Sequence, residues 1–539
     1  MFTKYNALLA GILLILLFTS ACGGAPASTA VPVTQEDSDY EFYNEPAVTE
    51  APAFEMPMAE EPASGLPDQS VSNSSQPHPR SNHEPYDMFF EDYGVNPSID
   101  TEDDNLSTFA LDVDTGSYTV MRNYLSEGNL PPADSVRVEE YVNYFDQGYA
   151  NPPQHQAFGI YIDGAPAPFT QSERYHMLRV GIQGYQVPEH ERKDASLTFV
   201  IDVSGSMDMD NRLGLVKRSL ELLVEQLRSS DTVSIVVYGT EAHVVLEPTP
   251  GSDKGRILDA IYGLHPEGVT NAEAGIRLGY KMAMHAYNPN GINRVVLCSD
   301  GVANVGETGP DAILEEIRGY VEEGVTMTSI GFGMDNYNDT LMEQLADNGD
   351  GFYAYVDDMD EARRLFVDQL TGTLQTIAMD AKVQVDFNPE VVMRYRLVGF
   401  ENRAVADEDF RDNSVDAGEI GAGHSVTALY EVKLYPEAYG NIATAFMRWQ
   451  DPDTRQVIEL SQDLSVGELE RNFEHADPYF QRAVIVAEYA EILKESYWAE
   501  ESSLRHVYRE AERVSELLPR DEDMSEFMQL IRRASHLTD

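Results

Sequence analysis

The chain has 539 residues, of which 42% are hydrophobic, so it is long enough for about two to four domains with real cores. Its 92 acidic residues outnumber 37 basic ones and give a formal net charge of -55. A surface this acidic repels nucleic acids and anionic lipid headgroups, whereas it attracts divalent cations and basic surfaces. The charge also fits a soluble protein that is adapted to a salty or exposed setting.

The N-terminus has the pattern of an export signal. Lys4 precedes the apolar stretch Leu8–Phe18, which is short for a membrane-spanning helix and suits a secretory signal. Two small residues then precede Cys22, and this arrangement resembles the bacterial lipobox, in which the cysteine is acylated and becomes the mature N-terminus. Thr19 departs from the lipobox, where Leu is usual. We expect residues 1–22 to be a lipoprotein signal peptide that leaves the protein lipid-anchored in the cell envelope, with ordinary cleavage as the alternative.

Residues 23–84 are rich in Pro, Ala, Ser, Glu and Gln and have few periodic apolar positions. Such a composition buries too little apolar surface to offset the entropy lost on ordering, so we expect a disordered tether. The second cysteine, Cys298, lies in an apolar run and is expected to be a buried, inert core residue. With Cys22 acylated, no disulfide is expected.

An N-terminal flanking domain is expected over residues 95–194, helical and then β. The stretch Leu106–Asp114 alternates like a strand, and helices are predicted over Ser117–Ser126 and Val136–Phe145. Apolar alternation returns between Phe158 and Tyr185, which indicates further strands.

Strand and helix patterns alternate over residues 195–375. The predicted strands are Leu197–Ile201, Thr232–Tyr238, His243–Leu246, Arg294–Cys298, Thr326–Ile330 and Gly351–Val356. The predicted helices are Arg212–Leu227, Ile257–Gly263, Ala272–His285, Ala312–Glu322 and Asn338–Ala346. Apolar residues of the first helix recur in steps of three and four, as a core-facing stripe does. This order predicts an α/β fold with a doubly wound, mostly parallel sheet and helices on both faces.

β patterns resume in residues 380–470, and residues 476–536 are expected to form C-terminal helices. The predicted strands are Ala381–Phe387, Arg394–Leu397, Ser425–Leu434, 441–449 and 455–460. The predicted helices are Tyr479–Ser496, Ser502–Leu517 and Asp521–Ala534. Short apolar runs interrupted by Gly and Pro are typical of a β-sandwich. Because β-rich blocks flank the α/β region on both sides, they could pair with each other and present it as an insertion.

Five oxygen-bearing side chains stand at the exits of predicted structure in the α/β region. Asp202, Ser204 and Ser206 follow the first buried strand, Thr270 precedes a helix, and Asp300 follows a later strand. The exits of parallel strands lie on one edge of the sheet, so these oxygens can converge there. Carboxylates and hydroxyls suit a hard divalent cation, Mg²⁺ or else Mn²⁺ or Ca²⁺, and suit a soft metal badly. Alternatively, the first two could simply cap a turn or helix.

The pattern Asp-x-Ser-x-Ser, then a distant Thr, then Asp-Gly resembles the von Willebrand factor type A domain with its metal-ion-dependent adhesion site (MIDAS). The resemblance implies that Ser204, Ser206 and Thr270 coordinate the cation directly or through water, and that Asp202 and Asp300 bind mainly through waters. In that family a partner carboxylate fills the position that the protein leaves open.

Some residues depart from the family pattern. Ser299 replaces the Thr that often precedes Asp-Gly, and Val269 stands where a small residue is frequent. Asp208 and Asp210 resemble the acidic residues of a neighbouring calcium site in some relatives, but their spacing differs, so a solvated acidic loop is the preferred interpretation. The segment Asp112–Ser117 echoes the motif superficially and is expected to be a strand end.

The flanks extend the resemblance. The blocks Asn105–Tyr118, Val136–Phe145 and Val415–His424 resemble segments of a family of bacterial von Willebrand factor A lipoproteins that have their own flanking domains. The resemblance covers roughly residues 95–535. It implies an architecture and brings no established ligand.

Motifs of catalysis are missing from the sequence. There is no His-Glu-x-x-His, no Gly-x-Ser-x-Gly and no phosphate loop that ends in Gly-Lys-Ser/Thr. His424 is the most suggestive histidine, yet a turn or packing role is preferred. Ser204 and Ser206 have no base near them in the sequence. We therefore expect a protein that is not an enzyme.

The expected function is protein binding in the cell envelope. The cation site would bind a protein ligand that supplies an acidic side chain, with the membrane contacted only through the lipid and with no nucleic-acid partner. One alternative is an envelope assembly factor or scaffold, whose flanking domains make the main contacts while the metal is mainly structural. The other is a hydrolase that uses the bound cation.

Overall fold

The computed structural model describes residues 88–170, 174–209, 211–301, 310–334 and 337–538. The predicted signal peptide, the lipidation site Cys22 and the predicted tether lie outside these residues. Each helix in the described ranges is either too short or too polar to cross a membrane.

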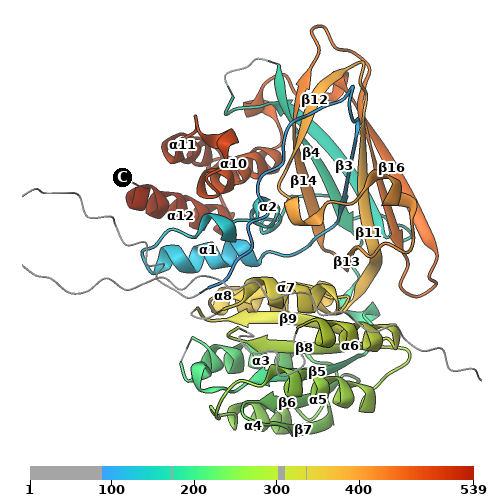
Figure 1. Cartoon of the computed structure of the whole chain (residues 1–539), viewed down its shortest axis with the longest axis vertical. Coiled ribbons are helices and arrows are strands. Elements are labelled where there is room, and N and C mark those ends of the chain that lie inside the picture. The colour runs from blue at the N-terminus through green and yellow to red at the C-terminus, as the bar shows by residue number, and fades with distance from the viewer. Residues whose placement is uncertain (1–87, 171–173, 210, 302–309, 335–336, 539) are drawn as a thin grey trace, which may run out of the picture. The chain divides into compact units, whose positions relative to one another are not determined.

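A six-stranded sheet forms the centre of the α/β domain, drawn in green to yellow in Figure 1. Its strands are β5 (Ala195–Asp202), β6 (Thr232–Tyr238), β7 (Ala242–Pro250), β8 (Ile292–Ser299), β9 (Thr326–Phe332) and β10 (Tyr353–Val356). The order is β10-β9-β8-β5-β6-β7, and all neighbours are parallel except β6 and β7. Every residue of β5 is buried, as expected for a parallel strand that is covered on both faces.

Helices cover both faces of this sheet. They are α3 (Leu213–Gln226), α4 (Lys254–Tyr262), α5 (Ala272–His285), α6 (Pro310–Glu322), α7 (Asp339–Asp347), α8 (Met359–Arg363), the π-helical segment η4 (Arg364–Asp368) and α9 (Leu370–Leu374). Successive residues of β5 face different cores. Phe199 shares a buried cluster with Leu220 of α3, whereas Val200 shares another with Ile276 of α5. The predicted doubly wound fold is confirmed, and Cys298 of β8 is a fully buried free thiol, as predicted.

The two β-rich flanks form one β-sandwich. One sheet has the order β1-β12-β14-β4-β3, and the other has the order β13-β11-β15-β16 with β2 also paired to β11. The strands are β1 (Ile99–Asp100), β2 (Leu106–Ala110), β3 (Phe158–Pro166), β4 (Tyr175–Gly184), β11 (Thr376–Phe387), β12 (Val392–Val398), β13 (Gly418–Gly421), β14 (Ser425–Leu434), β15 (Asn441–Gln450) and β16 (Val457–Ser465). Val180 of β4 lies opposite Ala428 of β14, and both sheets contribute to one buried cluster.

This pairing changes the predicted division of the chain. The strands of residues 95–194 and of residues 380–470 belong to one sandwich, because strands before the α/β domain pair with strands after it. The entry and exit of the α/β domain lie side by side, since the backbone N–H of Lys193 donates to Oε1 of Gln375 at 3.0 Å. The α/β domain is therefore inserted into the sandwich.

A helical unit combines segments from both ends of the described chain. Its helices are α1 (Gly116–Ser126), α2 (Val138–Asn143), α10 (Pro478–Leu493), α11 (Leu504–Ser515) and α12 (Glu522–Thr538). Tyr118 and Tyr141, from the first two helices, share a buried cluster with Tyr489 and Phe527 from the tail. The C-terminal helices predicted from the sequence therefore pack against the N-terminal helices α1 and α2. Long-range packing of apolar side chains produces this arrangement, so the order of elements along the chain does not reveal it.

Candidate metal centre

The carboxylate of Asp202 lies at the carboxyl end of β5 and is fully buried. Its Oδ1 accepts a hydrogen bond from the backbone N–H of Ser204 at 2.8 Å, and its Oδ2 accepts one from Oγ of Ser299 at 3.0 Å. Two donors therefore fix the orientation of the carboxylate at the edge of the sheet. Ser299, which departs from the family pattern, serves as one of them.

The two serine hydroxyls of the first loop converge. Oγ of Ser204 and Oγ of Ser206 lie 3.0 Å apart, because the loop tightens into a short 3₁₀ turn over Gly205–Met207. Ser204 is buried and Ser206 is exposed, so the pair reaches from the sheet edge to the surface. Two oxygens at this separation can serve as neighbouring ligands of one cation.

The loop that carries Thr270 is held against the first loop by its backbone. The N–H of Gly205 donates to the carbonyl oxygen of Gly268 at 3.0 Å, and the N–H of Glu267 donates to the carbonyl oxygen of Val203. Gly268 has a φ of +66°, and a Cβ atom there would lie 1.9 Å from Oγ1 of Thr240. Glycine is therefore required at this point, two residues before the partly exposed Thr270.

Asp300 follows β8, is 4% exposed and forms an ion pair with Arg212. Nη1 of Arg212 donates to Oδ2 of Asp300 at 2.8 Å and to the carbonyl oxygen of Ser206 at 2.7 Å, and Nη2 donates to the carbonyl oxygen of Met334. One guanidinium thus connects the first loop, the Asp300 loop and the segment after β9.

Arg212 was not among the site residues predicted from the sequence. One feature of the sequence could have indicated it, namely its position at the start of the predicted helix. A cation is unfavourable near a helix N-terminus unless a carboxylate compensates its charge. Asp208, one of the two acidic residues considered for a second site, is exposed, and Asp210 lies outside the described residues.

The electrostatics of the site favour a cation. Burial, reinforced by the nearby carboxylate of Asp300, raises the pKa of Asp202 to about 6. Burial also raises the pKa of Asp300, although hydrogen bonds from Ser206 and Arg212 partly offset the effect. Two buried carboxylates face one guanidinium, so the local charge is -1 when both are ionised. The oxygen-only donor set and this charge fit a hard divalent ion such as Mg²⁺.

The segment Asp112–Ser117, which echoes the motif, has another role. The strand predicted over Leu106–Asp114 ends earlier, at Ala110, so Asp112 lies beyond the end of β2. Oδ2 of Asp112 accepts a hydrogen bond from Nε of Arg403 at 2.9 Å. Glu343 of α7 accepts from the same guanidinium at 2.8 Å. These carboxylates are therefore already paired with an arginine of the same chain.

Comparisons with known proteins agree with this architecture. Residues 196–368 match the family described as von Willebrand factor type A domain, and residues 84–178 match one described as von Willebrand factor. Residues 372–441 and 435–537 match the family described as Uncharacterized protein YfbK, C-terminal.

Among individual proteins, the chain is 34% identical over 478 residues to Uncharacterized protein YfbK of Escherichia coli K12, covering 84% of this chain and 81% of that protein. It is 26% identical to human inter-alpha-trypsin inhibitor heavy chain H3 over 44% of this chain, which is 28% of that protein. A von Willebrand factor type A structure from Catenulispora acidiphila aligns with a TM-score of 0.42 at 15% identity, over 72% of this chain and 91% of that chain. The chain belongs to the bacterial von Willebrand factor type A proteins that carry a YfbK-type C-terminal domain.

Proposed function

We propose that this protein binds a protein partner through a divalent cation that Asp202, Ser204, Ser206, Thr270 and Asp300 hold. The observation that carries the proposal is the convergence of three loops at one sheet edge, where backbone hydrogen bonds and Arg212 join them. When bound, the ion would supply an electrophilic position that a carboxylate of the partner completes. A protein-interaction role agrees with the family, and we propose no catalytic one.

The surface around the site indicates what the partner must offer. Met209 on the first loop is 50% exposed, and Val269 beside Thr270 is 68% exposed. Exposed apolar side chains that flank a polar centre are typical of binding surfaces. The partner would therefore carry apolar residues beside its acidic side chain.

The placement of the protein in the cell is part of the same proposal. Residues 1–22 would direct export, Cys22 would carry the lipid, and residues 23–84 would separate the folded part from the membrane. Labelling with radioactive palmitate tests the anchor. A Cys22→Ser protein that still incorporates the label would contradict it.

Metal binding is tested first with the purified protein. Isothermal titration with Mg²⁺, and paramagnetic resonance with Mn²⁺, should detect one site that is lost in Asp202→Asn. The exposed Asp208→Asn is the matched control, because it removes a neighbouring carboxylate from outside the proposed ligand set. Equal losses in both variants would contradict the site.

Partner binding is tested with envelope extracts. A partner captured in Mg²⁺ should be lost in EDTA and in Asp300→Ala, while the melting temperature shows that the variant is folded. Capture that persists in EDTA would favour the alternative, a scaffold that makes its contacts through the sandwich and the helical unit.

A further inference from the structure

A second concave region lies away from the candidate metal site. It is a cavity of about 1320 Å³. Its walls include Glu189, shortly before β5, and Phe352, directly before β10, whereas the metal-site residues follow the carboxyl ends of strands. The π-helical segment η4 and the start of α12 complete it. The cavity therefore lies at the opposite edge of the α/β sheet and is separate from the metal site.

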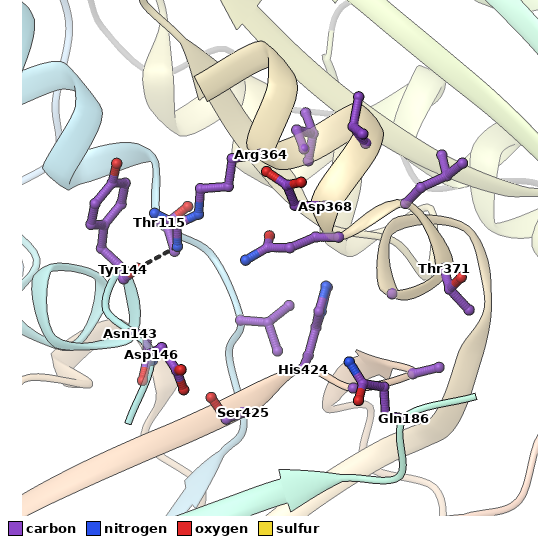
Figure 2. Close-up of a pocket in the computed structure, with 18 of the residues that line it drawn as sticks. Thr115, Asn143, Tyr144, Asp146, Gln186, Arg364, Asp368, Thr371, His424 and Ser425 are labelled. Atoms are coloured by element: carbon purple, nitrogen blue, oxygen red, sulfur yellow. Dashed lines mark hydrogen bonds between the residues drawn. The ribbon is translucent and has the colours of Figure 1, made fainter. Parts of the chain in front are cut away.

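The size of the cavity indicates an extended ligand. Pockets for small molecules usually measure about 300–1,000 Å³ and are mainly apolar. This cavity is larger, and Figure 2 shows polar side chains from several elements around it, including Thr115, Asp368, Thr371 and Ser425. A stretch of peptide can occupy such a space while it hydrogen-bonds to several walls.

The charge of the cavity lining indicates which kind of peptide the cavity would bind. Six carboxylates of the lining have no ion-pair partner in the described part of the chain: Asp146, Glu189, Asp360, Asp368, Glu522 and Asp523. The guanidinium of Arg122 is already paired, at 2.5 Å with Asp357 and at 3.2 Å with Glu526. The other arginines of the lining are Arg363 and Arg364, of which Arg364 is attracted to Glu361 and Asp523, so acidic charge prevails.

The remaining groups do not reverse this charge. The His424 ring points into the cavity in Figure 2, and burial together with Arg294 and Arg364 lowers its pKa to about 4, so it is neutral at pH 7. Arg364 lies 3.8 Å above the centre of the Tyr144 ring and donates to the backbone oxygen of that tyrosine. Its guanidinium is thereby committed to the wall of the cavity.

A metal ion is a poorer candidate than a peptide. The six unpaired carboxylates come from separate walls, and among the described residues no three of them are close enough together to share one ion. Spaced carboxylates match instead the spaced ammonium or guanidinium groups of an extended basic chain.

We propose that this cavity is a docking site for an extended Lys- or Arg-rich segment of a partner protein. The site acts independently of the metal site, so a partner could contact both edges of the α/β domain. The cavity carboxylates provide the charge complementarity, and they are spread widely enough to select an extended chain over a compact cation.

The test uses the full chain and a fluorescein-labelled eight-residue peptide that alternates Lys and Gly, followed by fluorescence anisotropy at physiological salt and in EDTA. The cavity variant combines Asp146→Asn, Asp360→Asn, Asp368→Asn and Glu522→Gln, all at exposed positions. It should bind the peptide at least tenfold more weakly than the unaltered chain.

A matched variant removes the same number of charges elsewhere. Glu322→Gln, Glu323→Gln, Glu437→Gln and Glu516→Gln lie at exposed positions outside the cavity lining. This variant should weaken binding less than twofold. Equal weakening in both variants would show attraction by net charge alone and overturn the proposal, as would unchanged binding in the cavity variant. Because EDTA is present throughout, failure here is distinct from failure of the metal site.

Discussion

Arg212 places a permanent positive charge beside a proposed metal ligand. Its side chain is 4% exposed and pairs with Asp300 at 2.8 Å, so Arg212→Met leaves a buried carboxylate without this cation. Breaking a buried ion pair in this way costs about 3–5 kcal/mol. We expect urea unfolding in EDTA to show a free energy of unfolding that is lower by about this amount in the variant. Mg²⁺ should recover part of it by supplying charge at the same carboxylate.

The control for this prediction is Arg256→Met, because Arg256 is exposed on α4. That variant should unfold within about 0.5 kcal/mol of the unaltered protein under both conditions. If Mg²⁺ does not recover any of the stability lost in Arg212→Met, the guanidinium stabilises the fold without acting at the metal site.

His424 should make the fold sensitive to acid. Its folded pKa is about 4, against 6.5 as the ordinary value, because burial and then Arg294 and Arg364 disfavour the charged ring. Between these pH values the unfolded chain binds a proton that the folded chain does not, so stability falls as the pH drops from 6.5 to 4. The size of this effect is about 1–3 kcal/mol. His424→Gln should remove this pH dependence of the free energy of unfolding. If the free energies of unfolding of the variant and the unaltered protein differ by the same amount at every pH between 6.5 and 4, His424 does not cause the acid sensitivity.

At the scale of elements, the Thr270 loop depends on one backbone conformation. Gly268→Ala should displace the loop, since it combines a φ of +66° with a contact of 1.9 Å to Oγ1 of Thr240. We expect the free energy of unfolding to fall by about 1–3 kcal/mol, measured by thermal unfolding, and Mg²⁺ binding to weaken, measured by titration. Gly255→Ala on α4 meets no atom within 4 Å and should stabilise the helix slightly. Normal Mg²⁺ affinity in Gly268→Ala would show that this loop does not contribute to the site.

The elements also show what the sequence could and could not reveal. The strands of the α/β domain were predictable because parallel strands read as continuous apolar runs, and β6 and α5 have the predicted bounds. The polar loops after β5 and β8 were predictable as motifs. The link from Arg212 to Met334 was not, since it depends on segments 122 residues apart. The helical segments α8, η4 and α9 after β10 were not predicted, because each is only five residues long, too short for an apolar period of 3.6 to stand out.

At the scale of the whole described molecule, the inserted α/β domain is held by more than its two connecting strands. Helix α1 lies along β10, where Oγ1 of Thr119 donates to the carbonyl oxygen of Tyr355 at 2.8 Å. This contact could not be predicted from the sequence, because it joins residues 236 positions apart. The resulting interface contains polar groups that must be paired on both sides, so it couples the unfolding of the insertion to that of the flanks.

Arg403 is the centre of that coupling. From the sandwich side it donates to Asp112 at 2.9 Å and, on α7 of the inserted domain, to Glu343 at 2.8 Å and Asp347 at 2.9 Å. Arg403→Met leaves several buried carboxylates facing one another without this cation. We expect calorimetry to show one cooperative transition in the unaltered protein and an earlier, separate transition of the α/β domain in the variant.

Arg411→Met provides the comparison, because Arg411 is 57% exposed and its pair with Glu459 lies on the surface of the sandwich. Exposed pairs contribute about 0–1 kcal/mol, so this variant should keep a single transition near the original temperature. If Arg403→Met also keeps a single transition, the contact of α1 with β10 is sufficient to couple the two parts, and the buried ionic cluster is not needed for the coupling.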